Sequence, residues 1–479
     1  MIDKHLGAPG LPLAAPAAGI ARAIAIAVHL VVVSVGNLPA QAGATEHAEP
    51  KAATTEHDEL DALVAQALEA NPAIRAAADR VEAARARISP AGALSDPWIG
   101  VGIQNLPLGR ENNGGHGLGG PDPMTMKMVE LGQTIPFPEK LELRRRAAEY
   151  ELAAAEASLA GARLEVEREV KDAYYELAFL DRVLEVLERS RALMASFVQV
   201  VESRYGLGVA SQREVLEARA EAARLAQEAA AVVEQRRAAL ARLNAALDRP
   251  SDTPVERPVI PPRIAQAAVA KSPTRMRFAA SALGARGADS PLPPLAELQE
   301  TALRENPELR AQQAMISAQE ARVELARKAH LPDFDFALQY GQRDARPDMV
   351  SAMVSVEIPI WKGRKQDMQV KEAEAELSAL RAEHHARANA IRARVAELYA
   401  ELERDRTQLA LYANSIIPQG RAALASATAS YEVGRADFLT VLENRATLYD
   451  YEIAYFRVLT DFARKLAELE QVVGKEVLR

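Results

Sequence analysis

The stretch YGLGVASQREVLEAR, residues Tyr205–Arg219, has a counterpart in YEVGRADFLTVLENR, residues Tyr431–Arg445. The two share a Tyr-x-x-Gly start and a Val-Leu-Glu-x-Arg end, at one constant offset of 226 residues (431 − 205). Each lies between two long segments that are rich in alanine and charged residues and have helical periodicity. The pattern predicts a turn at the tip of a helical hairpin in each stretch, and therefore a duplicated chain.

The composition of the 479 residues narrows the functional class. The formal net charge is −8 and aromatic residues make up 5%, so a basic stripe with stacking platforms for nucleic acid is absent. There is no cysteine, which excludes disulfides, zinc thiolate sites and an acylated N-terminal Cys. HExxH, G-x-S-x-G and phosphate-loop motifs are also absent. We therefore predict a protein that is not an enzyme, carries no cofactor and does not bind nucleic acid.

The N-terminus has the pattern of an export signal over residues 1–42. Residues Ile20–Val35 are almost wholly apolar, basic residues stand at Lys4 and Arg22, and Ala40-Gln41-Ala42 supplies a small-residue cleavage site. The alternative is a short membrane anchor, although the apolar run is shorter than the ~20 residues of a spanning helix.

Residues 43–58 are polar and irregular, and we expect them to form a disordered tail. The repeated Thr-Glu-His within them makes His47 and His57 weak candidates for metal binding. The adjacent His384 and His385 point apart on a helix and do not form a metal site.

The remaining chain divides into two copies, 59–249 and 295–479, around a proline-rich linker at 250–294. Each copy reads as helix, two strands, very long helix, tip turn and returning helix. Periodicity predicts helices over 60–88, 139–204, 212–247, 295–329, 362–430 and 438–474. At 1.5 Å per residue, the helix over 139–204 would be roughly 100 Å long. Helices of this length indicate a coiled coil or a wall of packed helices.

The strands show period-two alternation, with one apolar and one polar face. The apolar face is expected to carry Ile99, Val101, Ile103, Met126, Phe334, Phe336, Val350, Ala352, Val354 and Val356. The polar face is expected to carry Thr125, Lys127, Asp333, Asp335, Ser351, Ser355 and Glu357. Met124, Met126 and Met128 could form a ladder for a soft metal or pack against an apolar surface. We interpret the glycine-rich segment 105–123 as a surface loop.

Such strands suit a membrane, because a bilayer accepts the apolar face and water the polar one. Only a closed barrel satisfies backbone hydrogen bonds in lipid, and four strands are too few to close one. Closure therefore requires several chains.

These features resemble the outer membrane efflux family of which TolC is a member. The resemblance rests on the duplication, two strands per copy, the long helices and the two Tyr-x-x-Gly tips. The Ile135–Lys140 stretch IPFPEK resembles the metal-efflux branch, except that glycine is more usual at Glu139.

The resemblance implies an α+β membrane protein that assembles as a homotrimer in the outer membrane. It combines a transmembrane β-barrel, completed by trimerisation from four strands per chain, with a long α-helical coiled-coil barrel that crosses the periplasm. The expected lumen carboxylates are Asp333, Asp335 and Glu357.

The resemblance also places a gate at the periplasmic tips. Acidic positions just after the tip glycine fall at Glu214 and Glu217 in the first copy and at Thr440 and Glu443 in the second. Thr440 departs from the acidic pattern. A ring of Glu443 carboxylates would attract cations; alternatively, Glu217 and Glu443 pair with nearby arginines on a solvated helix face.

Six further tip positions have expected structural roles. Tyr205 and Tyr431 are expected to support the turns, and Gly208 and Gly434 to provide their backbone freedom. Arg219 and Arg445 could clamp each hairpin or link helices at the gate.

The expected function is the exit channel of a tripartite efflux system, working with a periplasmic adaptor and an inner-membrane RND pump. The family branch and the acidic lumen favour heavy-metal cations as cargo. The alternatives are export of drugs or organic solutes, type I secretion, or a periplasmic coiled-coil adaptor.

Overall fold

The computed structural model of the chain describes residues 55–106, 124–256, 258–268, 292–343 and 346–478. The expected export signal, His47 and the glycine-rich loop 107–123 lie outside these residues. Among the helices within the described ranges, none combines the length and the apolar character needed to cross a membrane.

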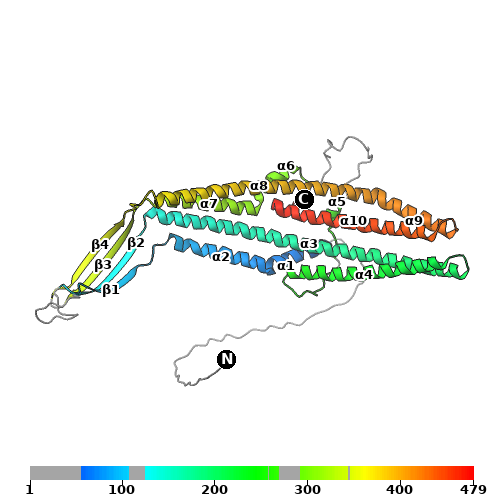
Figure 1. Cartoon of the computed structure of the whole chain (residues 1–479), viewed down its shortest axis with the longest axis horizontal. Helices are drawn as coiled ribbons and strands as arrows, with labels where there is room; N and C mark the ends of the chain where they lie inside the picture. The colour runs from blue at the N-terminus through cyan, green and yellow to red at the C-terminus, as the bar shows by residue number, and fades with distance from the viewer. Residues whose placement is uncertain (1–54, 107–123, 257, 269–291, 344–345, 479) are drawn as a thin grey trace, which may run out of the picture. The chain divides into compact units, whose positions relative to one another are not determined.

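The two copies repeat one order of elements, as Figure 1 shows by label and colour. The first copy contains α1 (Thr55–Ala70), α2 (Pro72–Gly92), β1 (Trp98–Gln104), β2 (Met126–Ile135), α3 (Pro138–Gly206) and α4 (Gln212–Ala246), and α5 (Pro262–Ala268) follows it. The second copy contains α6 (Leu295–Glu305), α7 (Pro307–Lys328), β3 (Asp333–Arg343), β4 (Met349–Glu357), α8 (Gln366–Leu411), the π-helical turn η1 (Tyr412–Ile416), α9 (Ile417–Glu432) and α10 (Phe438–Val473).

Several boundaries differ from the sequence-based expectations. Residues 55–58, expected to be disordered, already belong to α1, and this places His57 in a helical turn. The linker contains the short helix α5. The second long helix is interrupted by η1 directly before Pro418, whose missing N–H and bulky ring prevent a regular helical bond to residue 414.

Asn-Pro pairs restart a helix at the same point in each copy. Asn71 Oδ1 accepts a hydrogen bond from Ala73 N at 2.8 Å, and Asn306 Oδ1 accepts from Glu308 N at 2.9 Å. Each amide also donates to the end of the returning helix: Asn71 Nδ2 to Ala246 O and Asn306 Nδ2 to Val472 O, both at 2.9 Å. In each copy, one buried side chain thus caps the helix that follows it (α2 or α7) and ties that helix to the base of a hairpin.

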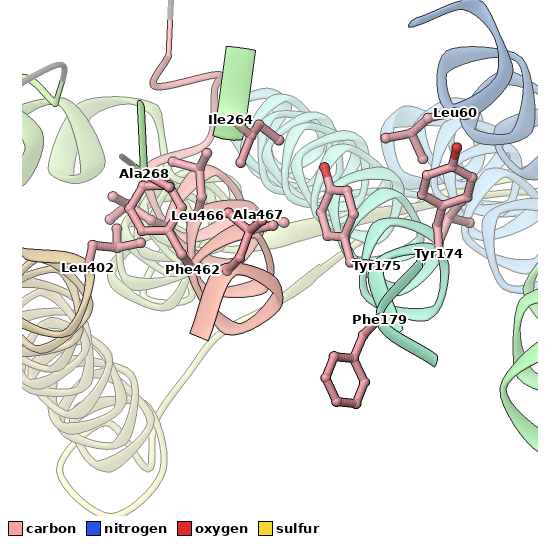
Figure 2. Close-up of a cluster of buried hydrophobic side chains, with 14 of the residues drawn as sticks. Leu60, Tyr174, Tyr175, Phe179, Ile264, Ala268, Leu402, Phe462, Leu466 and Ala467 are labelled. Carbon is pink, nitrogen blue, oxygen red and sulfur yellow. The ribbon is translucent and has the colours of Figure 1, made fainter. Parts of the chain in front are cut away.

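A continuous apolar core joins the two copies along the helices. Tyr174 and Tyr175 on α3 are almost fully buried, with ring centroids 6.1 Å apart in an edge-on arrangement. Figure 2 shows Leu60 of α1 beside Tyr174, and Ile264 of α5 near the α10 side chains that include Leu466. Burial of these side chains is the main force that holds the helices together.

The four strands form one antiparallel sheet in the order β1-β2-β3-β4. Residues that face each other across strands lie on the same side of the sheet. One face is apolar and exposed, with Ile99, Val101, Val129, Leu131, Phe336, Leu338, Val350 and Val354. The other face carries Asp333, Asp335, Gln339, Ser351, Ser355 and Glu357.

Two residues of β2 lie on the opposite face from the one we expected. Lys127 is paired with Ile103 and Gln342, which places it on the apolar face. Met126 is paired with Gln104 and Arg343 and lies on the polar face. The apolar residues that decide the face of β2 are Val129 and Leu131, because flexible methionines occur in both environments.

The methionines fill space on the polar face. A Cβ atom at Gly341 would lie 2.7 Å from Met126 Sδ, so the thioether covers the bare backbone of the neighbouring strand. Met128 Sδ accepts a hydrogen bond from Gln339 Nε2 at 3.2 Å. These contacts occupy both sulfur atoms with protein groups.

Candidate functional site

The two hairpin tips share one backbone conformation. Gly208 and Gly434 both have φ of +71° directly after a long helix. The following amides return to the helix end, since Val209 N donates to Arg204 O at 2.9 Å and Arg435 N to Ser430 O at 2.8 Å. The left-handed φ accounts for glycine at both positions.

The tyrosines that precede these glycines have different environments. Tyr205 is 48% exposed, whereas Tyr431 is 3% exposed. The guanidinium of Arg204 lies 4.6 Å from the Tyr431 ring centroid, and its Nη1 donates to Tyr431 O at 3.1 Å. Tyr431 therefore supports the contact between the two tips, while Tyr205 remains at the surface.

A small apolar cluster joins the tips. Phe438 is fully buried in it, with its ring centroid 5.6 Å from that of Tyr431 and 6.4 Å from that of Phe197. The buried members are Val201, Ala210, Val215 and Ala218 from the first hairpin and Ala427, Tyr431, Phe438 and Val441 from the second. The tips pack together through side chains of both copies.

The acidic residues of the first tip are occupied by local contacts. Glu214 forms a capping box with Ser211: its Oε1 accepts from Ser211 N at 3.1 Å, and its own N–H donates to Ser211 Oγ at 3.3 Å. Glu217 pairs with Arg213 at 2.9 Å. The alternative of arginine pairing thus holds for Glu217.

The second tip differs at both equivalent positions. Thr440 is exposed and carries no charge, and its N–H donates to Asp437 O at 3.1 Å. Glu443 is exposed on α10, and no ion pair joins its carboxylate to any basic side chain that the structure describes. Glu443 is therefore the available carboxylate of the four predicted gate positions.

The paired arginines also differ. Arg219 is exposed and clamps its own hairpin through Glu202 of α3, at 2.7 Å. Arg445 is 6% exposed, and its guanidinium donates to Ser190 O of α3, so it links the two hairpins. Burial lowers the pKa of Arg445 below its ordinary value, because desolvation penalises the cation.

The predicted lumen carboxylates lie on the same, polar face of the sheet. Asp333 accepts hydrogen bonds from Lys140 Nζ at 2.7 Å and from Phe137 N at 3.0 Å, which fixes the start of α3 against β3. Asp335 accepts from Thr134 Oγ1 at 2.6 Å. Glu357 has no ion pair among the described residues and leaves its charge available to the polar face.

Sequence reasoning missed two residues that organise these sites. Lys140 is buried and bridges Asp333 and Leu331 O, yet in the sequence it resembles any surface lysine at the start of a helix. Arg204 covers Tyr431 of the other copy, a contact between residues 227 positions apart. Neither pairing has a signature in local spacing.

Comparison with known proteins places this architecture in a family. The model of the family "outer membrane efflux protein" matches residues 63–249 and 298–475. A curated relative, the cobalt-zinc-cadmium resistance protein CzcC of Cupriavidus metallidurans, is 21% identical over 347 residues, or 72% of this chain and 77% of the relative.

Two solved structures have a similar fold. The outer membrane protein VceC of Vibrio cholerae has a TM-score of 0.69 at 20% identity, covering 87% of this chain and 96% of VceC. The outer membrane channel MtrE of Neisseria gonorrhoeae has a TM-score of 0.67 at 17% identity, covering 88% of this chain and 90% of MtrE.

The matching family is one of outer membrane efflux proteins rather than of enzymes, and MtrE is an outer membrane channel. The family match covers most of the described residues, in two blocks that correspond to the two copies. The chain belongs to the outer membrane efflux protein family.

Proposed function

We propose that three copies of this chain form the outer-membrane exit channel of a tripartite efflux system for metal cations. The observation that carries this proposal is the four-stranded sheet, which has an exposed apolar face and two unpaired edges at β1 and β4. Pairing β4 of one copy with β1 of the next closes a twelve-stranded barrel, and closure satisfies the edge groups that lipid cannot.

The long helices of the three copies would continue this barrel as a tunnel through the periplasm. The hairpin tips lie at the far ends of α3 and α9 from the strands (Figure 1). A periplasmic adaptor and an inner-membrane RND pump would dock there.

The tunnel entrance would carry a ring of three Glu443 carboxylates. The absence of an arginine partner for Glu443 among the described residues supports this assignment, whereas the pairing of Glu217 with Arg213 removes Glu217 from it. Glu214 would be held in place as part of the cap of α4, and Thr440 is neutral. Three exposed carboxylates around an axis concentrate cations and disfavour anions.

Two observations support metal cations as the cargo. The curated relative CzcC is named for resistance to cobalt, zinc and cadmium. The polar face of the sheet carries Glu357 without an ion pair in the described structure, so the lumen would remain acidic. Drugs, organic solutes or a secreted polypeptide would be the cargo under the alternative reading.

Deletion of the gene, followed by growth in graded metal concentrations, tests this proposal. We expect greater sensitivity to divalent cations such as cobalt, zinc or cadmium, with little change for organic toxicants, and restoration by the wild-type gene. If the deletion strain is sensitive to organic toxicants only, the cargo is organic solutes rather than metal cations.

Fractionation of the complemented strain tests the channel itself. Heat-modifiable, detergent-dependent trimers in the outer-membrane fraction are expected. A soluble periplasmic protein would instead support the adaptor alternative and would contradict the channel.

A further inference from the structure

The two strand-to-helix junctions of the chain have the same Ile-Pro start but different surfaces. In the first copy, Ile135-Pro136 leads directly into α3 at Pro138. In the second copy, Ile358-Pro359 is followed by the segment 360–365 before α8 begins at Gln366. We define residues 358–365, IPIWKGRK, as the junction turn.

The first junction is packed and electrically neutral. Phe137 is half-buried, and its N–H donates to Asp333. Lys140 is buried and forms an ion pair with Asp333 at 2.7 Å. Over Ile135–Lys140, all of which the structure describes, the exposed apolar group is Pro138 alone, and no cation is left unpaired.

The junction turn, in contrast, exposes a large apolar group. Ile358 is 71% exposed, Ile360 is 72% exposed and Trp361 is 67% exposed. The turn is nevertheless ordered by its backbone, because Trp361 O accepts from Arg364 N and Lys365 N, both at 3.0 Å. An ordered turn that exposes three large apolar side chains within four residues indicates a surface that an apolar partner covers.

The position of the turn identifies the apolar partner. Val350, Val354 and Val356 lie on the apolar face of β4, and Ile358 continues their period of two beyond the end of the strand. Under the proposed function this face contacts lipid, so the junction turn lies where the hydrocarbon region ends on the periplasmic side. Tryptophan and basic residues are enriched at this depth in membrane proteins.

The charge of the junction turn indicates which lipid headgroup it would contact. Lys362 and Arg364 are exposed, and no ion pair holds either one in the described structure. The carboxylate next along the chain, Asp367, already faces His330 Nε2 at 3.4 Å. Lys365 lines a cavity of about 550 Å³ together with Lys140 and Glu357, whereas Lys362 and Arg364 do not line it. Lys362 and Arg364 are therefore the cations available to an external anion.

We infer that the junction turn is a binding site for anionic phospholipid in the periplasmic leaflet. Ile358, Ile360 and Trp361 would contact the acyl chains, and Lys362 and Arg364 would contact the phosphate. This inference rests on the proposed function, since it requires the sheet to lie in a bilayer. It assigns to the second copy an anchoring role that the first copy lacks.

The two tryptophans of the chain make a direct test possible, because Trp98→Phe leaves Trp361 as the only indole. The full-length protein is reconstituted in bilayers of phosphatidylcholine that contain increasing fractions of brominated lipid, either phosphatidylglycerol or phosphatidylcholine. We expect stronger quenching of Trp361 by the brominated anionic lipid at equal mole fraction. The preference is expected to be up to about fivefold for each cation that faces the headgroup.

The double variant Lys362→Gln/Arg364→Gln should abolish this preference while quenching by brominated phosphatidylcholine persists. The matched control, Arg237→Gln/Arg242→Gln, changes the net charge equally on α4, away from the gate positions, and should keep the preference. In the complementary Trp361→Phe protein, the remaining Trp98 should show no such preference. The difference in quenching between wild type and Trp361→Phe therefore reports on Trp361 even if Trp98→Phe fails to fold.

Ion conductance measured in the same bilayers separates the two proposals. A conducting protein whose Trp361 is quenched equally by both lipids, or by neither, overturns the lipid site and leaves the channel intact. Of these two outcomes, quenching by neither lipid would indicate that a second copy of the chain, rather than lipid, covers the turn. A protein that neither inserts nor conducts contradicts the channel and the lipid site together.

Discussion

The first and second hairpin tips have the same backbone conformation but different side-chain environments. Both turn at a glycine with φ of +71°. After the turn, the first tip places Gln212 in solvent at the start of α4, whereas the second places Phe438 in a buried cluster at the start of α10. The first tip stabilises itself through its own cap and ion pairs, and the second is held by the first.

This difference assigns separate tasks to the two copies. Arg204 and Val201 of the first hairpin hold Tyr431 and Phe438 of the second, so motion of one tip must disturb the other. Among the predicted gate positions, the carboxylate that makes neither a cap nor an ion pair in the described structure is Glu443, which belongs to the second tip. The two copies thus share the conformation of the turn and differ in packing and charge.

The largest expected effect comes from Phe438→Ala. Loss of a fully buried aromatic side chain typically costs about 3 to 5 kcal/mol, part of which is the cavity left behind. Hydrogen exchange should show faster exchange of amides at the start of α10 and at the end of α9. The matched substitution Gln212→Ala should leave exchange at the start of α4 nearly unchanged. Equal effects at the two tips would contradict the difference in packing.

Substitution of the tip glycines should give smaller and equal effects. Alanine at a left-handed φ costs roughly 1 to 2 kcal/mol, and no neighbouring atom lies within 4 Å of a Cβ at Gly208 or Gly434. Gly208→Ala and Gly434→Ala should therefore accelerate exchange at their own turns to the same extent. A clearly larger effect at one tip would show that its conformation, as well as its packing, differs.

Removal of the helix caps should destabilise the first tip more than the second, the opposite of the result expected for Phe438→Ala. Ser211 caps α4 with its hydroxyl, whereas Asp437 makes no side-chain cap to α10. Ser211→Ala should cost about 1 kcal/mol of local stability, and Asp437→Ala should cost less. Exchange rates of the first-turn amides of α4 and α10 provide the comparison. A greater loss of local stability with Asp437→Ala than with Ser211→Ala would contradict the conclusion that the first tip is the one capped by its own side chain.

The architecture could be predicted from the sequence because the decisive patterns are periodic. The tip repeat, the long helical runs and the strand alternation give the order of elements, since burial of one face follows directly from spacing. Asn71 and Asn306 also carry recognisable cap signatures. The faces of Met126 and Lys127 could not be predicted, because register with β1 and β3 decides them rather than local alternation.

For the hairpin tips, the sequence predicts which positions are equivalent but not the contacts that their side chains make. The offset between the copies identifies Glu217 and Glu443 as equivalent, but their ion-pair states depend on which residue lies four places earlier. Arg213 precedes Glu217 by one helical turn, while Leu439 precedes Glu443 and offers no charge. The burial of Arg445 and Tyr431 arises from contact with the other copy, which no local pattern encodes.

The most direct test of the central claim is the ion selectivity of the reconstituted protein in planar bilayers. Wild-type protein should form cation-selective pores, and Glu443→Gln should reduce both the conductance and the preference for cations over anions. Glu217→Gln, which removes the equivalent but paired carboxylate, should leave both close to wild type. Absence of pores, or equal selectivity in wild type and Glu443→Gln, would contradict a cation channel gated at the second tip.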